Sequence, residues 1–273
     1  MEAVAAYTNE QAAAKAFSAQ SGVFDEIYSG NTIVNYKRDR VRAHVMQYLK
    51  PNSHILELNS GTGEDAIFFA GKGHRVHATD IAEGMQQKLR EKAAKTPFGT
   101  QITTENCSFT QLHTLKHNGP FDHIFSNFAG LNCTGELDKV LLSLPPLLNA
   151  NGVATLVILP RFCLWESLLI FKGMFKTATR RWLSKNGVKA HVEGTYFTCW
   201  YYDPSYVVDT LKDSFEVLAI EGLCTIVPPS YIEHFAERHP RSYQWLKKME
   251  DRYRFSRLWR SIGDYYIISL RKK

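Results

Sequence analysis

The chain has 273 residues, of which 44% are hydrophobic and 22% charged, and its formal net charge is +6 with a pI of about 9.0. This length suits one large α/β domain, or one domain with an insertion, and the composition excludes a disordered chain as the default. The basic excess is compatible with an anionic ligand, a nucleic acid or an acidic membrane surface, and is too small to choose among them.

The first 160 residues alternate helical and strand-like patterns. Residues 1–50 are predicted to form an N-terminal helical cap, in which one or two short helices precede an amphipathic helix over 32–49. Strands are then predicted at 53–59, 74–80, 101–107, 121–127 and 151–159, and helices at 64–72, 82–94 and 134–148. This order predicts a parallel sheet covered by helices on both faces.

The regular alternation ends at Pro160. Residues 161–203 are rich in aromatic and basic side chains and too long for a simple crossover, so we expect an insertion there. A strand at 215–223, a second irregular helical segment over 228–262 and a last strand at 264–272 complete the chain. Two final strands joined by a long excursion suggest an antiparallel edge of the sheet.

The cysteines are scattered and odd in number: Cys107, Cys133, Cys163, Cys199 and Cys224. Without a CxxC pair, they argue against a disulfide framework and against a structural zinc site, and no metal site is predicted. Reduced thiols in the cytoplasm are the simpler interpretation. The N-terminus has no signal-peptide pattern, and no stretch approaches about 18 uninterrupted apolar residues, so no transmembrane helix is expected.

A glycine-containing loop follows the first strand of the predicted sheet, in ILELNSGTGEDA (55–66). Gly61 and Gly63 would let the backbone approach a ligand closely, because no Cβ intervenes, and the following helix adds a positive N-terminal dipole. Asp80 ends the next strand, 19 residues after Gly61. A carboxylate there can accept hydrogen bonds from both hydroxyls of a ribose.

The charges around this loop separate two classes of cofactor. GTGEDA fits the nicotinamide dinucleotide fingerprint only loosely, and Glu57 lies inside the preceding strand. Glu57, Glu64 and Asp65 would repel a pyrophosphate, whereas a cationic sulfonium and an α-amino group would be attracted. The pattern favours S-adenosylmethionine.

Over residues 24–160, and more weakly beyond, the sequence resembles class I S-adenosylmethionine-dependent methyltransferases, in particular the bacterial small-molecule branch. ELNSGTG resembles their E/DxGxGxG motif, with Asn59 in place of the first glycine; asparagine tolerates a left-handed backbone better than other non-glycine residues. The resemblance implies a single Rossmann-like α/β domain, with a seven-stranded, mostly parallel sheet, an antiparallel C-terminal edge, and a helical and aromatic lid inserted after strand 5.

Two further motifs imply a nucleoside site. ATDIAEGM resembles the family's second motif, which implies that Asp80 binds the ribose while Ile81 and Met85 pack near the adenine. CSFTQL stands where the family often has a Gly-Asp-Ala-like turn, so Ser108 takes the position of the acid that contacts the adenine amine. Phe109 could line the ring.

The methionine end of the cofactor has its own candidates. FDHIFSNFAGLN resembles the fourth-strand motif and implies that Asn127 and Phe128 face the methionine end and the methyl group. FDEIY resembles the YDxxY segment of small-molecule members and implies that Tyr28 covers the cofactor carboxylate. Arg38 could pair with that carboxylate directly, since arginine offers a bidentate fork.

The basic run within 161–185 leaves several interpretations open. Its cations are Lys172, Lys176, Arg180, Arg181 and Lys185. The segment could be a lid with a basic rim, an interfacial helix touching anionic lipid, an RNA-contacting patch, or a packed helix with solvated cations. We favour the lid, because an insertion after strand 5 lies over the ligand-binding ends of the strands.

The sequence as a whole predicts methyl transfer to a small acceptor. The aromatic stretches 195–203 and 228–235 would wall a pocket for an aromatic or lipophilic substrate, with oxygen favoured over nitrogen or carbon as the acceptor atom. His191, His234 and Tyr231 are candidate bases, although a phenol of low pKa needs none. DNA-base methylation loses support because SNFAG lacks the prolines of that motif, so a nucleic-acid partner is disfavoured.

Two alternatives to a small-molecule enzyme remain: an RNA methyltransferase and a non-catalytic S-adenosylmethionine-binding protein. Peripheral membrane contact is left open. We expect a monomer or a homodimer.

Overall fold

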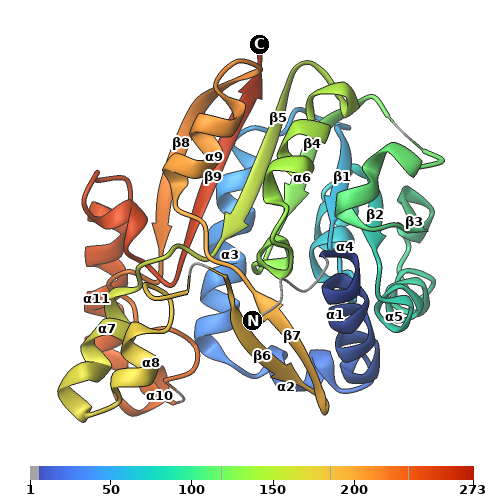
Figure 1. Ribbon diagram of the computed structural model, residues 1–273. Coiled ribbons are helices and arrows are strands. Elements are labelled where there is room, and N and C mark those ends of the chain that lie inside the picture. The colour runs from blue at the N-terminus through green and yellow to red at the C-terminus, as the bar shows by residue number, and fades with distance from the viewer. Residues whose placement is uncertain (1–5, 118, 185, 233) are drawn as a thin grey trace.

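The computed structural model describes residues 6–117, 119–184, 186–232 and 234–273 (Figure 1). The first five residues of the predicted cap, and Lys185 of the basic run, lie outside the described residues. No helix within the described ranges is long and apolar enough to cross a membrane.

A seven-stranded sheet forms the centre of the fold, in the order β3-β2-β1-β4-β5-β9-β8. Its strands are β1 (His54–Leu58), β2 (Arg75–Asp80), β3 (Ile102–Asn106), β4 (Phe121–Ser126), β5 (Leu148–Ile158), β8 (Phe215–Leu223) and β9 (Tyr265–Lys272). The first five strands pair in parallel, and β9 pairs antiparallel with β5 and β8. The predicted sheet and its antiparallel edge are confirmed.

Helices cover both faces of this sheet. They are α3 (Thr32–Met46), α4 (Glu64–Gly71), α5 (Glu83–Ala93), α6 (Leu137–Ser143) and α9 (Pro204–Leu211). One core joins the sheet to α3, α4 and α5 through Val41, Phe69 and Leu89. The other joins it to α6 and α9 through Leu137 and Val207. The strand order reverses between β1 and β4, which opens a crevice at the carboxyl ends of the strands.

The predicted helix over 134–148 is too long. Helix α6 ends at Ser143, a 3₁₀ turn over Pro145–Leu147 follows, and β5 already begins at Leu148. The physical reason is the pair Pro145 and Pro146, because proline lacks the N–H that an α-helix needs and its ring clashes with the preceding turn.

The insertion after β5 contains a hairpin that the sequence analysis did not predict. Short helices α7 (Leu164–Leu168) and α8 (Phe175–Thr179) come first, followed by β6 (Val188–Val192) and β7 (Thr195–Cys199), which pair antiparallel. Glu193 and Gly194 connect the two strands with positive φ angles of 44° and 73°. That backbone is typical of the two-residue turns that match the strands' twist.

Two outer groups of elements flank the sheet. Helices α1 (Ala6–Gln20) and α2 (Phe24–Ser29) precede α3 in the N-terminal segment, and α1 packs against the hairpin through Ala13, Ala16 and Phe197. The segment 228–262 contains α10 (Phe235–Arg238) and α11 (Pro240–Tyr253). It meets the first insertion where the Leu164 amide donates to the Ile262 carbonyl at 2.9 Å, and α7, α8, α10 and α11 form one corner of the molecule (Figure 1).

Candidate functional site

A cavity lies at the carboxyl ends of β1, β2 and β4, with α1 and α2 over it. Ten of the thirteen predicted cofactor residues line it: Arg38, Glu57, Asn59, Gly61, Asp80, Ile81, Met85, Phe109, Asn127 and Phe128. The structure therefore brings together residues from five separate parts of the sequence. Tyr28, Gly63 and Ser108 are outside the lining.

Asp80 is held in place by the backbone around it. Its Oδ2 accepts a hydrogen bond from the Gly61 amide at 2.9 Å, and its Oδ1 accepts one from the Ala82 amide at 2.8 Å. Burial raises the pKa of Asp80, and these backbone bonds oppose the rise. Each oxygen keeps a further lone pair, so the carboxylate can accept hydrogen bonds from two hydroxyls.

Glu57 is the second carboxylate of the cavity. Its side chain is 3% exposed, and its Oε2 has no hydrogen-bond partner among the described residues. Burial and the neighbouring Asp65 raise the pKa of Glu57 well above its ordinary value, and Arg42 opposes this. A buried acceptor without a partner is costly, and a cationic ligand group in the cavity would complete it. This fits the ammonium of S-adenosylmethionine and disfavours a pyrophosphate.

Asn59 connects the loops that follow β1 and β4. It adopts a left-handed φ of 47°, as its place in the glycine motif predicts. Its amide donates to the Asn127 carbonyl at 2.9 Å, and its Oδ1 accepts from the Ser126 hydroxyl at 2.6 Å. A Cβ on Gly130 would lie 2.3 Å from the Asn59 side chain. The asparagine thus fixes the distance between the two loops, which a glycine would not do.

The two motif glycines have different environments. Gly61 has a φ of 55°, and a Cβ there would meet no atom within 4 Å, so its backbone stays open to a ligand. Gly63 has a φ of 81°, and a Cβ there would lie 2.4 Å from the Leu89 side chain. Gly63 lets α4 approach α5 and does not face the cavity.

A chain of polar contacts fixes the loop after β4. Arg42 donates to Asp65 at 2.7 Å, and Asp65 in turn accepts from the Asn127 amide at 2.7 Å. Phe128 and Ala129 follow with positive φ angles of 48° and 60°. Non-glycine residues at such angles store strain and are found at functional sites. The contacts hold Phe128 in the cavity wall.

The N-terminal cap supplies a different aromatic residue from the one predicted. Phe24 lines the cavity, whereas Tyr28 packs behind it with the ring centroids 4.7 Å apart. Arg38 does line the cavity; its guanidinium lies 5.5 Å from the Phe128 ring, and its buried Nε has no partner in the described structure. An anionic ligand group would satisfy that donor.

Glu10 was not predicted as a site residue; it is 2% exposed and lines the cavity from α1. Its Oε2 accepts hydrogen bonds from the hydroxyls of Ser108 and Thr110, and no described atom pairs with its Oε1. Ser108 is therefore buried behind Glu10 instead of facing the ligand. Glu10, Ala13, Ala14 and Phe17 all line the cavity, and their spacing puts them on one helix face. That spacing was the available signal.

The three candidate bases stand apart from the cavity. His191 is exposed on β6, with its ring 4.4 Å from that of Tyr196. His234 lines a second pocket with Ile232 and Glu237, opposite the α2–α3 turn. Tyr231 is 46% exposed, and burial raises its phenol's pKa, so less of it is ionised at neutral pH and able to accept a proton. None of the three is among the described residues that line the cavity.

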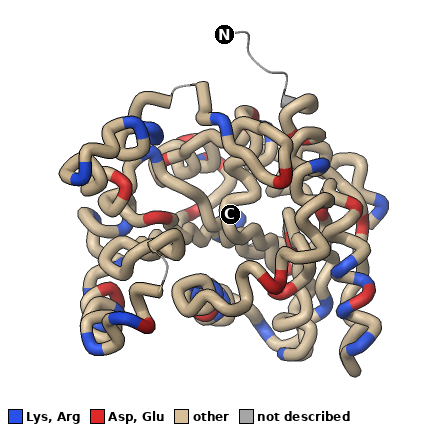
Figure 2. Tube along the Cα trace, turned by 90° about the horizontal axis from the view of Figure 1, so that it is seen from below, with Lys and Arg blue, Asp and Glu red and all other residues tan. Residues whose placement is uncertain are grey.

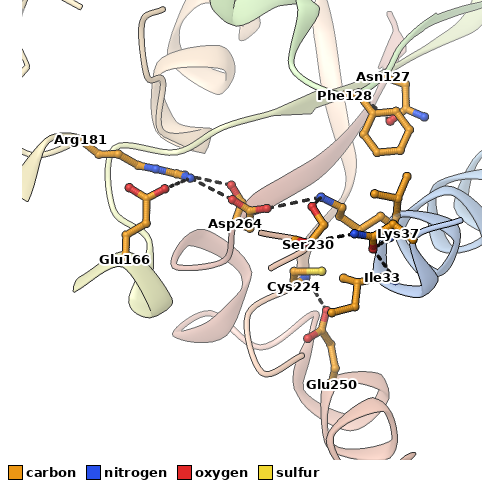
Figure 3. Close-up of polar contacts among 12 residues, drawn as sticks. Ile33, Lys37, Asn127, Phe128, Glu166, Arg181, Cys224, Ser230, Glu250 and Asp264 are labelled. Carbon is orange, nitrogen blue, oxygen red and sulfur yellow. Dashed lines mark hydrogen bonds and ion pairs between the residues drawn. The ribbon is translucent and has the colours of Figure 1, made fainter. Parts of the chain in front are cut away.

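A buried ionic cluster lies beside the site (Figure 3). Cys163, Glu166 and Asp264 place three potential ligand atoms within 4.8 Å of one another. Arg181, however, donates to Glu166 at 2.6 Å and to Asp264 at 2.9 Å. On its other side Asp264 faces the Lys37 ammonium at 3.6 Å. These cations already neutralise the carboxylates, so the cluster joins segments of the chain and is a poor metal site.

The comparisons with known proteins agree with this geometry. Residues 55–152, which contain the glycine loop, Asp80 and the β4 loop, match the family model described as a methyltransferase domain. Among curated proteins, none matches the sequence.

Solved structures share the whole fold. The 1,6-didemethyltoxoflavin-N1-methyltransferase of Burkholderia thailandensis, with bound 1,6-didemethyltoxoflavin and S-adenosylhomocysteine, aligns with a TM-score of 0.60 and 13% identity over 100% of this chain and 92% of that chain. The CcbJ methyltransferase of Streptomyces caelestis aligns with a TM-score of 0.61 and 17% identity, over 94% of this chain and 98% of that chain. The [4+2]-cyclase SpnF aligns with a TM-score of 0.63 and 13% identity, over 97% of this chain and 96% of that chain. At these identities the likeness shows the fold alone.

Proposed function

We propose that this chain, a class I S-adenosylmethionine-dependent methyltransferase, transfers the cofactor's methyl group to a small aromatic or lipophilic acceptor, with oxygen favoured over nitrogen or carbon. The observation that carries the cofactor assignment is the unpartnered, buried carboxylate oxygen of Glu57 in a cavity that also contains Asp80. The observation that favours the acceptor class is the aromatic wall made by Phe24 and Phe128.

The lining residues divide along the length of the cofactor. Asp80 would accept hydrogen bonds from the ribose hydroxyls, and Ile81, Met85 and Phe109 would enclose the adenine. Glu10 would accept a hydrogen bond from the adenine amine with its Oε1, in place of the acid that Ser108 replaces.

Two charged groups would hold the methionine end. Glu57 would pair with the ammonium, and Arg38 would donate its unpaired Nε–H to the carboxylate. Asn127 would position the loop that carries Phe128 and would not bind the cofactor through its amide, which already donates to Asp65. Tyr28 would hold Phe24 in the cavity wall by packing against its ring.

When bound, S-adenosylmethionine supplies an electrophilic methyl group that is displaced in line with sulfur. Phe24 and Phe128 would orient a flat acceptor and exclude water from it. An apolar wall suits this reaction because positive charge disappears as the methyl group leaves sulfur. None of His191, His234 and Tyr231 would remove the proton of the acceptor. An acceptor that is already ionised, such as a phenol of low pKa, needs no base.

The solved structures that this chain resembles also bear on the alternative reactions. The Burkholderia thailandensis enzyme carries a small heteroaromatic ligand and is an N1-methyltransferase, which keeps nitrogen open as the acceptor atom. SpnF is a cyclase on the same fold, and shows that the fold alone does not decide the reaction. The five cysteines are all free thiols, which supports our proposal of a cytoplasmic location.

A ligand-shift experiment tests the cofactor assignment. S-adenosylmethionine at about 100 times its dissociation constant should stabilise the fold by roughly 2.7 kcal/mol, whereas NAD should not. Asp80→Ala should abolish the shift, and Asp209→Ala, which removes an exposed carboxylate on α9, should keep it. A shift with NAD and none with S-adenosylmethionine would overturn the assignment.

An acceptor panel then tests the transfer. Small phenols, aromatic amines and activated carbon acids would be incubated with S-adenosylmethionine, and S-adenosylhomocysteine and methylated product measured by mass spectrometry. We expect turnover with at least one phenol. Cofactor binding without turnover on any compound would favour the non-catalytic binding protein, and turnover on RNA alone would favour the RNA methyltransferase.

A further inference from the structure

The segment 161–185 exposes apolar side chains to an unusual degree. Six of the seventeen large hydrophobic residues that are exposed in the described structure fall between positions 168 and 183. They are Leu168, Phe171, Met174, Phe175, Trp182 and Leu183, which we call the apolar patch. Phe171 is 84% exposed, Leu183 77% and Phe175 62%. A monomeric protein rarely leaves so many large apolar groups together in water without a use for them.

The patch does not result from poor packing of the segment, because the inward side of the same segment is firmly fixed. Arg181 is 4% exposed and bonds to Glu166, to the Asp264 carboxylate and to the Asp264 carbonyl. Arg180 makes a two-point contact with Glu166 at 2.9 and 2.7 Å. In Figure 3, Asp264 lies between Arg181 and Lys37, so the segment is tied to the residue directly before β9 and through it to Lys37 of α3.

Turning the patch inward would break this buried ionic cluster and leave unpaired charges, which is strongly unfavourable. The cluster therefore determines which side of the segment faces water. The apolar patch is a surface that the fold presents in one fixed orientation.

The surroundings of the patch are basic. Lys172 and Lys176 lie within it and are exposed, each directly after one of the two phenylalanines. Segments 161–185 and 228–262 together contain fourteen of the 33 Lys and Arg residues and five of the 27 Asp and Glu residues. They carry a net charge of +9, and the rest of the chain carries −3. Figure 2 marks Lys and Arg in blue and Asp and Glu in red along the chain trace.

Large apolar side chains with lysines beside them match the interface of an anionic bilayer. Phenylalanine, leucine and tryptophan enter the boundary between headgroups and acyl chains, and lysine extends to the lipid phosphates. An RNA surface would need many phosphate contacts, because these dominate its affinity. Within the patch itself six large apolar groups accompany Lys172 and Lys176, and RNA phosphates gain nothing from such apolar groups, so the composition favours lipid. We propose that the apolar patch, with Lys172 and Lys176, docks this protein on the surface of an anionic lipid bilayer.

Docking as proposed does not depend on the identity of the acceptor. One consequence does rest on the proposed function: a lipophilic acceptor would be concentrated in the same bilayer that the patch contacts. Cofactor binding to the protein in solution, measured separately, distinguishes failure of the docking from failure of the methyltransferase assignment.

Vesicle flotation tests the docking with the full chain. Vesicles of phosphatidylcholine mixed with phosphatidylglycerol should carry the protein upward in a density gradient, and vesicles of phosphatidylcholine alone should carry much less. The double variant Lys172→Glu/Lys176→Glu should weaken binding by about 25-fold or more at low salt, since each lysine near an anionic surface contributes roughly fivefold. The double variant Phe171→Ser/Phe175→Ser should lose about tenfold or more at every salt concentration.

Two matched controls use exposed residues elsewhere. Leu142→Ser removes an apolar side chain that is 58% exposed on α6, and Lys95→Glu reverses a charge after α5; both should float like the wild type. All variants should keep the wild-type melting temperature and S-adenosylhomocysteine affinity, which shows that they are folded.

Three results would overturn the proposal. The first is a wild-type protein that stays out of the floating fraction with both kinds of vesicle. The second is a dimer in size-exclusion chromatography that the Phe171→Ser/Phe175→Ser variant dissociates, which would identify the patch as a subunit interface. The third is a protein that does not bind vesicles but binds RNA in a salt-dependent way, with the RNA binding lost in the Lys172→Glu/Lys176→Glu variant.

Discussion

The cofactor half of the molecule and its basic corner are built by different means. Around β1, β2 and β4, hydrogen bonds to backbone groups hold the polar side chains: Asp80 accepts from the amides of Gly61 and Ala82, and Asn59 donates to the Asn127 carbonyl. In the corner formed by 161–185 and 228–262, buried ion pairs make the contacts, as when Arg181 donates to the carboxylates of Glu166 and Asp264. The comparison indicates that hydrogen bonds to backbone groups hold much of the site, whereas the surface beside it depends on a few buried ion pairs.

The difference between the two regions should be largest when Arg181, the cation at the centre of the corner, is removed. Arg181→Met leaves Glu166 and Asp264 buried without their shared partner, so we expect a loss of about 3–5 kcal/mol in the free energy of unfolding. Arg180→Met is the matched control; this side chain is 41% exposed, and we expect about 1 kcal/mol or less. Urea unfolding measures both.

The folded fraction of Arg181→Met should still bind S-adenosylhomocysteine as the wild type does, since Asp80 and Glu57 are not among the groups that Arg181 contacts. A cofactor affinity that falls in step with stability would show that the two regions are not independent.

Within the cofactor half, Glu10 should determine the preference for adenine. Glu10→Gln should weaken S-adenosylhomocysteine binding by about 10–100-fold, because the amine loses a buried carboxylate acceptor. It should improve relative binding of S-inosylhomocysteine, whose carbonyl can accept from the glutamine amide. Isothermal titration with both ligands measures the ratio, and Glu26→Gln, at an exposed position on α2, is the control. An unchanged ratio would exclude Glu10 from adenine recognition.

The pH dependence of cofactor affinity should be the smallest of these effects. Because burial raises the pKa of Glu57, part of the free protein holds this carboxyl protonated, and a cationic ligand favours the ionised form. Affinity should therefore rise with pH, by at most about tenfold per unit, below about pH 7, where the ligand ammonium stays charged. Glu57→Gln should bind more weakly and with a smaller slope. Affinity that falls as pH rises would contradict the pairing.

The cofactor half also shows how far the sequence could be interpreted. The sheet, its antiparallel edge and ten lining residues followed from periodicity and from motifs whose members are neighbours in sequence. Asn59 was correctly expected to be left-handed because a glycine motif leaves little choice there.

What the sequence did not reveal depends on distant contacts. Glu10 enters the site only because α1 packs over it and Ser108 bonds to it from 98 residues away. The hairpin β6–β7 packs on α1 through Phe197, a contact between segments far apart in sequence. The distances of His191, His234 and Tyr231 from the cavity are likewise set by tertiary packing, which no local pattern encodes.

The most direct test of the central claim is isothermal titration of S-adenosylhomocysteine into the wild type and into Asp80→Ala. The account predicts saturable one-to-one binding to the wild type, and a loss of about 100-fold or more in the variant, because two hydrogen bonds from the ribose to a carboxylate disappear. Absence of binding to the wild type, or equal affinities for the two proteins, would contradict a cofactor site at the carboxyl ends of β1, β2 and β4.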